Sequence, residues 1–168
     1  MASAYGHVNV VQQLLAYDAA VDHVNATGKS SLFIAATNGH VQVCALLLEK
    51  GAAVDRTHTI SGTTPLLAGA ELGHVAVVQL LAVFGAGITT ADNDGWTPHS
   101  TAAAEGHDAL ATWLTVVEAW SPLQIGAGCR LSSAATTAVQ LGVVDPEQGG
   151  VGAMLAARAT AASTAPWG

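Results

Sequence analysis

The sequence is short of charged residues, and above all of basic ones. Of its 168 residues, 5 are Lys or Arg and 12 are Asp or Glu, which gives a formal net charge of −7. A chain of this charge repels phosphates, so non-specific binding to nucleic acid is disfavoured. A protein partner with a basic or neutral surface is easier to accommodate.

Cysteine and membrane-directed segments are also scarce. Cys44 and Cys129 lie far apart and form no Cys-x-x-Cys pair, which favours free thiols in a reducing, intracellular compartment, cytoplasmic or nuclear. The N-terminus has neither a basic start nor an apolar core, so we expect no signal peptide. The longest uncharged run, Leu72 to Ala91, has the length of a membrane helix. It is interrupted by Gln79 and Gly85, however, and we expect no membrane span.

Catalytic motifs are absent from the sequence. It contains no nucleophile elbow, no phosphate-binding loop and no His-Glu-x-x-His, and Ser, His and Asp without a defined geometry are no evidence of a triad. We therefore expect no enzyme and no cofactor. The alternative is a metal-dependent enzyme that uses His58, His99 and nearby acids.

What the sequence does contain is a Gly-His pair that returns at intervals of 33, 34 and 33 residues. The four copies are Gly6-His7, Gly39-His40, Gly73-His74 and Gly106-His107. A fixed period of this length indicates a repeat protein. One unit cannot bury its apolar face alone, so neighbouring units must stack.

Within one period the residues predict two helices. Thr64 is suited to cap the first helix, and Pro65 follows at the first helical position, where its missing N–H costs nothing. Gly73 ends that helix and Gly85 ends the second, because glycine adopts the left-handed conformation there. The apolar stripe of the second helix consists of Val75, Val77, Val78, Leu80 and Leu81. Ser30 and Thr97 occupy the same cap position in the neighbouring units.

These elements resemble those of the ankyrin-repeat family. The matching segments are Thr64-Pro65-Leu66-Leu67, Gly73-His74 and Gly51-Ala52-Ala53-Val54-Asp55. The resemblance covers roughly residues 1–145. It implies an all-α solenoid of stacked helix-turn-helix units with short β-hairpin-like fingers between them.

The spacing divides residues 1–145 into about five units. These are a partial unit at 1–24, units at 25–57, 58–91 and 92–120, and a degenerate unit at 121–145 that begins at Ser121-Pro122. One extra residue before Ser61 accounts for the interval of 34 and predicts an extended finger. Residues 146–168 form an Ala- and Gly-rich tail, which we expect to be disordered or one short helix.

The resemblance implies a non-catalytic protein-binding module, an adaptor or scaffold, that uses the concave surface formed by the finger tips and the first helices. Carried over to this sequence, the partner-binding positions are Lys29, Thr37, Asn38, Ile60, Ser61, Thr63, Glu71, Leu72, Asn93, Asp94, Trp96 and Glu105. From the residues themselves, Trp96 in a turn is a candidate interface anchor, although its ring could instead fold over its own finger. The acids beside it form either an acidic patch or a solvated rim.

Other expectations concern metal, assembly and completeness. The four repeated histidines lie too far apart to share an ion, so we expect no metal site, and we expect a monomer. The first unit lacks half a helix, and the spacing from Thr97 to Ser121 is nine residues shorter than a full period. The alternative function is therefore that of a structural or truncated fragment of a larger ankyrin protein, with no activity of its own.

Overall fold

The structure is a computed structural model that describes residues 1–125, in which α-helices joined by turns and loops make up the regular secondary structure. Its helices are α1 (Val8–Ala16), α2 (Ser31–Thr37), α3 (Val41–Glu49), α4 (Pro65–Glu71), α5 (Val75–Val83), α6 (Pro98–Ala104) and α7 (Asp108–Ile125). The described residues contain no strand, and one isolated antiparallel bridge joins Val24 to Ser30. None of the helices in this range is both long enough and apolar enough to cross a membrane.

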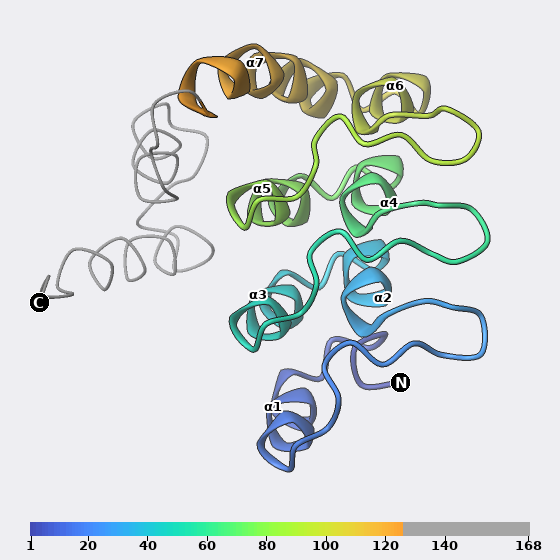
Figure 1. The fold of residues 1–168 in the computed structure, drawn as a ribbon, viewed down its shortest axis with the longest axis vertical. Coiled ribbons are helices and arrows are strands. Elements are labelled where there is room, and N and C mark those ends of the chain that lie inside the picture. Colours follow the sequence, from blue (N-terminus) through green and yellow to red (C-terminus); the bar gives the residue numbers. More distant parts are fainter. Residues whose placement is uncertain (126–168) are drawn as a thin grey trace, which may run out of the picture. The chain divides into compact units, whose positions relative to one another are not determined.

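The helices stack in two layers. The first helices of successive units pack on one another, α2 on α4 and α4 on α6, and the second helices pack in the same way, α1 on α3 and α3 on α5 (Figure 1). Within a unit, α2 contacts α3 and α4 contacts α5. The loops between units project on the side of the first helices (Figure 1). The predicted all-α stack of two-helix units is therefore confirmed.

The helix starts follow from side-chain caps. The hydroxyls of Ser30 and Thr64 accept hydrogen bonds from backbone N–H groups three residues further on, at 3.1 and 3.2 Å. Thr97 does the same for Ser100, and the Ser100 hydroxyl accepts from the Thr97 backbone, which completes a capping box. Each bond satisfies an N–H group that the helix itself leaves without an acceptor. The predicted caps are confirmed.

The helix ends depend on left-handed backbone. Gly39 and Gly73 have φ of 72° and 68°, and Gly51 and Gly85 end the second helices with φ of 87° and 90°. In the first unit Asp18 stands where these closing glycines stand, and it takes a φ of 60°. A side chain at such a φ is strained, though less so for Asp than for most residues.

The core lies between the two layers and along the stack. Fully buried side chains come from the second, third and fourth units, whereas in the first unit Val11 is the one buried residue of α1. In the central units they include Leu32, Val43, Leu47, Leu66, Val77, Val78, Leu80 and Leu81. The predicted apolar stripe of the third unit is confirmed except at Val75, which is 39% exposed because it lies in the first turn of α5.

The predicted start of a helix at Ser121 is wrong. Helix α7 continues through Ser121 and Pro122 to Ile125. By the repeat spacing, Glu118 stands where Gly51 and Gly85 end the earlier second helices, so the left-handed stop is missing and the helix is free to continue. The rest of the predicted fifth unit and the tail at 146–168 lie outside the described residues.

Candidate partner-binding surface

The three loops that project beyond the first helices are called fingers here. Finger 1 is Asn25–Lys29, finger 2 is His58–Thr63 and finger 3 is Asp92–Trp96, and each is closed by a backbone hydrogen bond from its first residue to the carbonyl of its last, at 2.8–3.0 Å. Fingers 1 and 3 span five residues and finger 2 spans six. The residue inserted in the long interval therefore lies in the turn of finger 2, which confirms the predicted extended finger.

Fingers 1 and 3 are built in the same way from a side chain at their base. The Asn25 Oδ1 accepts hydrogen bonds from the backbone N–H groups of Thr27 and Lys29, both at 3.0 Å. The Asp92 Oδ1 accepts from those of Asp94 and Trp96, at 3.0 and 2.9 Å. A side-chain acceptor that holds two amides of the same turn fixes its backbone. These fingers are thus preformed.

Finger 2 has a histidine at the equivalent position, and that histidine joins two fingers. The His58 Nδ1 lies 2.8 Å from the Ser61 hydroxyl of its own finger, while Nε2 lies 2.9 Å from the carbonyl oxygen of Thr27 in finger 1. Since a carbonyl oxygen only accepts, Nε2 carries the proton. The ring also contacts Phe33, at 5.6 Å between centroids. Sequence reasoning considered His58 as a metal ligand and missed this role.

Finger 3 is joined to finger 2 through Asn93. The Asn93 side-chain amide donates to the carbonyl of Ile60 at 2.9 Å, and its backbone N–H donates to that of Ser61 at 3.0 Å. Asn93 was predicted to bind a partner, and its side-chain amide is already engaged within the array. The three fingers therefore form one connected row.

Three predicted binding residues present apolar surface to solvent. Ile60 in finger 2 is 75% exposed, Trp96 in finger 3 is 48% exposed, and Leu72 at the end of α4 is 49% exposed. Half the surface of Trp96 is thus accessible although its backbone is fixed. Exposed aromatic and aliphatic side chains on rigid backbone are the common anchors of interfaces.

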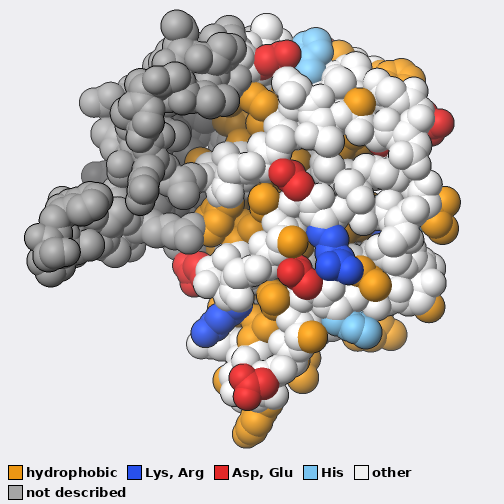
Figure 2. Space-filling model, viewed as in Figure 1, with side chains coloured by type: hydrophobic (Ala, Val, Ile, Leu, Met, Phe, Trp, Pro, Cys, Tyr) orange, Lys and Arg blue, Asp and Glu red, His pale blue; other side chains and the backbone are white. Residues whose placement is uncertain are grey.

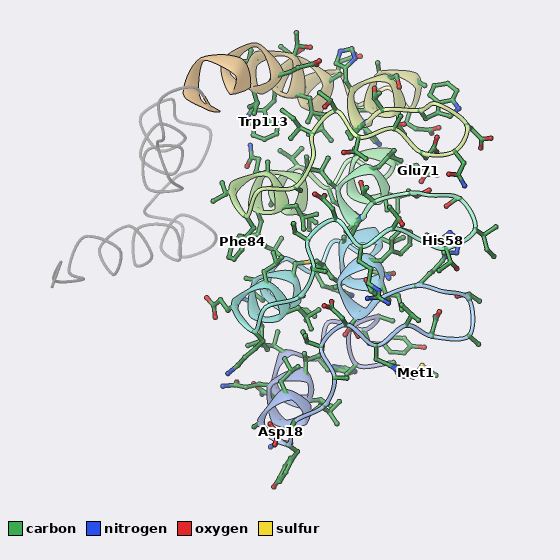
Figure 3. The ribbon with its side chains drawn as sticks, in the orientation of Figure 1. Met1, Asp18, His58, Glu71, Phe84 and Trp113 are labelled. Carbon is green, nitrogen blue, oxygen red and sulfur yellow. The ribbon has the colours of Figure 1, made fainter. Side chains whose placement is uncertain are left out.

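The predicted acids Glu71, Asp94 and Glu105 are all exposed. Glu71 lies on the same side of the array as finger 2 with His58, whereas Phe84 and Trp113 lie on the side of the second helices (Figure 3). On the face shown in Figure 2 the acidic side chains appear as separate spots rather than one continuous patch.

The remaining predicted positions have structural contacts of their own. Thr63 is 9% exposed, and its hydroxyl is hydrogen-bonded to that of Ser61 at 2.6 Å, so its side chain is withdrawn from the surface. Thr37 and Asn38 donate from their side chains to carbonyls one turn back in α2, at 2.9 and 2.8 Å. The Lys29 ammonium lies 5.4 Å from the centre of the Phe33 ring. Of these, Asn38 is the exposed one.

The repeated histidines connect neighbouring units. The Nε2 atoms of His40, His74 and His107 lie 2.9, 3.1 and 3.1 Å from the carbonyl oxygens of Ala4, Thr37 and Glu71, each in the preceding unit. Each ring also covers the glycine two residues after that carbonyl. A Cβ atom added at Gly6, Gly39 or Gly73 would approach the ring within 2.6–2.8 Å. The Gly-His pair thus recurs because the glycine of one unit receives the histidine of the next.

Comparison with known proteins agrees with this geometry. The family model described as ankyrin repeats (3 copies) matches residues 1–58. Within this matched range the chain carries ankyrin repeats. The helices of the described residues fit an all-α ankyrin-repeat fold. No curated protein matches the chain.

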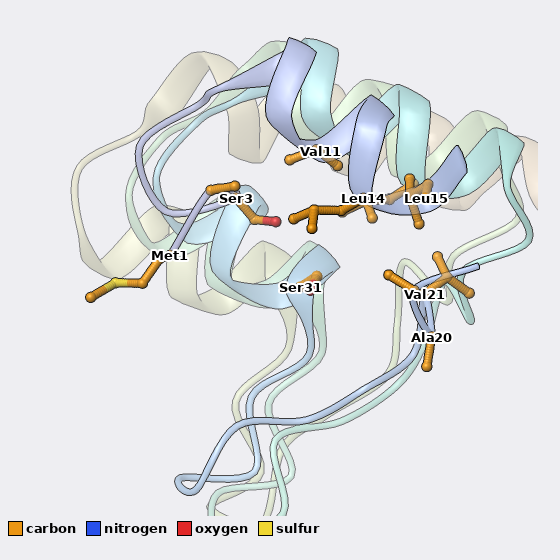
Figure 4. Close-up of a pocket in the computed structure, with 11 residues that line it drawn as sticks. Met1, Ser3, Val11, Leu14, Leu15, Ala20, Val21 and Ser31 are labelled. Carbon is orange, nitrogen blue, oxygen red and sulfur yellow. The ribbon is translucent and has the colours of Figure 1, made fainter. Parts of the chain in front are cut away.

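No site for chemistry stands out in the described part of this ankyrin fold. Within it, no group of three or more His, Cys, Asp or Glu side chains is placed to hold a metal ion. A cavity of about 130 Å³ lies between α1, the N-terminal residues and the second unit (Figure 4), and its lining contains no ionisable side chain. It is lined by small and aliphatic residues with Ser3 and Ser31. Such a lining can hold an apolar group but supplies no acid, base or nucleophile.

Proposed function

We propose that this ankyrin array binds a protein partner through its three fingers and the adjoining ends of α4 and α6. Ankyrin repeats are generally protein–protein interaction modules. The observation that carries the proposal is the exposure of Ile60, Leu72 and Trp96 on backbone that hydrogen bonds already hold in place. Because the fingers are preformed, little conformational entropy is lost when a partner covers them.

The chemistry of these positions indicates what the partner offers. Trp96 and Ile60 are suited to bury apolar side chains, and the exposed acids Asp94, Glu71 and Glu105 are suited to contact Lys or Arg. The partner surface is therefore basic or neutral, with apolar side chains at its centre. The chain acts as an intracellular adaptor, cytoplasmic or nuclear, and carries out no reaction itself.

The proposal is tested by affinity capture followed by mass spectrometry. The native chain is compared with Trp96→Ala/Asp94→Lys, which removes the aromatic anchor and reverses one charge on finger 3. The matched control is Tyr17→Ala/Glu49→Lys, which removes an 87% exposed aromatic side chain and reverses an exposed charge at the ends of α1 and α3. We expect a protein that the native chain and the control recover equally and that the finger variant loses at least tenfold.

Two results would contradict the proposal. Equal recovery of every protein by all three chains would exclude the finger face. Recovery of no protein above background would favour the alternative of a structural fragment without independent activity.

A further inference from the structure

The contact between neighbouring units has two complementary halves. We define the leading half as the histidine, whose ring contacts the preceding unit, and the apolar residues three and seven positions after it; an example is His74 with Val77 and Leu81, which are buried on α5 where α5 packs on α3. The trailing half, on the preceding unit, offers a glycine with positive φ and a carbonyl oxygen two residues before it, as in Gly39 and Thr37. The structure forms this contact three times within residues 1–125.

A fourth leading half lies open on α1. It consists of His7, Val10 and Leu14, and Val10 is 45% and Leu14 50% exposed. The equivalent residues of the inner units are buried, since Val43 and Val77 are both 0% exposed and Leu47 and Leu81 are 2% and 0% exposed. Within residues 1–125, the α1 residues thus have the apolar character of an inner contact but are not covered as the inner residues are.

A fourth trailing half lies open on α6 among the described residues. A Cβ atom added at Gly106, whose φ is 79°, would meet none of the described atoms within 4 Å, whereas its three counterparts are covered by histidine rings. Ala103 is exposed, while the equivalent Ala36 and Ala70 are 0% exposed. The carbonyl of Ala104 occupies the place of the acceptors that His40, His74 and His107 use.

The neighbouring surface of α7 is compatible with burial. Thr112 and Thr115 are exposed where the equivalent Ala45 and Leu48 are buried. Their hydroxyls already donate to the carbonyls of Asp108 and Ala111, at 2.8 and 3.0 Å. Covering them would therefore leave no hydroxyl hydrogen without an acceptor.

We propose that the leading half of one copy of this chain docks on the trailing half of a second copy. His7 would then donate to the carbonyl of Ala104 and cover Gly106, while Val10 and Leu14 would lose their contact with water. The acids nearest the trailing half are Glu105 and Asp108, whereas residues 1–17, which carry the leading half, contain no Asp or Glu, so two chains of net charge −7 meet here without repulsion between acids of the two contact surfaces. The proposed association is an alternative to the monomer expected from the sequence, and it does not involve the finger surface.

Such a contact is head-to-tail. It leaves one free half at each end of a pair, so association continues into open chains unless the geometry closes a ring. Two exposed apolar side chains form a small contact, so the assembly is weak and depends on protein concentration.

Sedimentation velocity over a series of concentrations tests the proposal on the full chain. We expect the native sedimentation coefficient to rise with concentration. Val10→Glu blocks the leading half and Ala103→Glu blocks the trailing half, and each variant alone should stay monomeric. Both substitutions are at exposed positions, and unchanged helical circular dichroism and melting would show that the fold is kept.

The mixture of the two variants gives the sharpest result. Val10→Glu retains a native trailing half and Ala103→Glu retains a native leading half, so an equimolar mixture should form one-to-one dimers and nothing larger. Ile60→Glu, at a finger tip outside both halves, is the control and should associate like the native chain. A native chain that stays monomeric, a single variant that still associates, or a mixture without dimers would each overturn the proposal.

Discussion

The imidazole ring of His74 lies directly against Gly39, and its Nε2 donates to the carbonyl of Thr37 at 3.1 Å. The His74 side chain thus covers the C-terminal end of α2 and holds the start of α5 against it. The contact depends on the absence of a side chain at Gly39 as much as on the histidine. The Gly-His pair is therefore a device for stacking units, and its period in the sequence is the period of the array.

Substitution at two equivalent glycines separates the contribution of this ring contact to stability from the cost of backbone strain. Gly39→Ala places a methyl group 2.8 Å from His74 Nδ1 at a φ of 72°, whereas Gly106→Ala meets the same kind of φ, 79°, with no described atom within 4 Å. Strain alone costs about 1–2 kcal/mol. We expect urea denaturation to show a larger loss for Gly39→Ala than for Gly106→Ala. Equal losses would show that the ring contact contributes nothing.

Replacing the leucine at one repeat position should lower stability by different amounts in different units. Leu47 is 2% exposed in α3 and the equivalent Leu14 is 50% exposed in α1. Leu47→Ala removes a buried side chain and leaves a cavity, at a cost of roughly 2–5 kcal/mol. Leu14→Ala should cost less than half of that, because half of the Leu14 surface stays in contact with water in the folded chain and no closed cavity forms. Denaturant titration of both variants is the measurement, and unchanged stability of Leu47→Ala would contradict its place in the core.

Two threonine hydroxyls should have opposite effects when replaced by a methyl group. The Thr101 Oγ1 is buried without a hydrogen-bond partner among the described residues, so Thr101→Val removes a desolvated polar group and is expected to raise stability by about 1 kcal/mol. The Thr64 hydroxyl caps α4, so Thr64→Val should lower stability by about 1 kcal/mol. Thermal melting followed by circular dichroism compares them. Destabilisation by Thr101→Val would reveal an acceptor for its hydroxyl.

The thiol of Cys44 should be inert in the native state. Burial raises its pKa from 9.0 to about 12. Because only the thiolate reacts, alkylation in a Cys129→Ser background should stay slow up to about pH 9 and become fast when urea unfolds the chain. Because the pKa of Cys44 is higher in the folded chain than in the unfolded chain, the stability of the fold is unaffected by ionisation of this thiol below pH 9. It declines as the pH rises from 9 towards 12, since the unfolded chain then loses the thiol proton more readily. Rapid native alkylation at pH 8 would contradict the burial of Cys44.

Much of the fold could be predicted because it depends on local signals. Ser and Thr cap a helix when they directly precede it, as Ser30, Thr64 and Thr97 do here. Glycine ends a helix where the backbone takes a positive φ. The continuation of α7 through Ser121 could not be predicted in the same way. A Ser-Pro pair is typical of a helix start. Here Glu118 replaces the glycine that would end α7, so the helix runs on through the Ser-Pro pair.

The candidate surface was less predictable from sequence. Trp96 and Ile60 are exposed as a turn position suggests. Thr63 is buried, however, and Asn93 and His58 are used between fingers, because those roles depend on how one unit lies on the next. The carbonyl groups that His58 and Asn93 contact in the neighbouring fingers are 31 and 33 residues away in the sequence, and no local pattern specifies them.

Hydrogen–deuterium exchange of the chain, free and with its captured partner, tests the central claim most directly. The account predicts slower exchange in residues 25–29, 58–63 and 92–96 when the partner is bound, with little change in α3 and α5. Protection of α3 and α5 with unchanged exchange in the three fingers would contradict it.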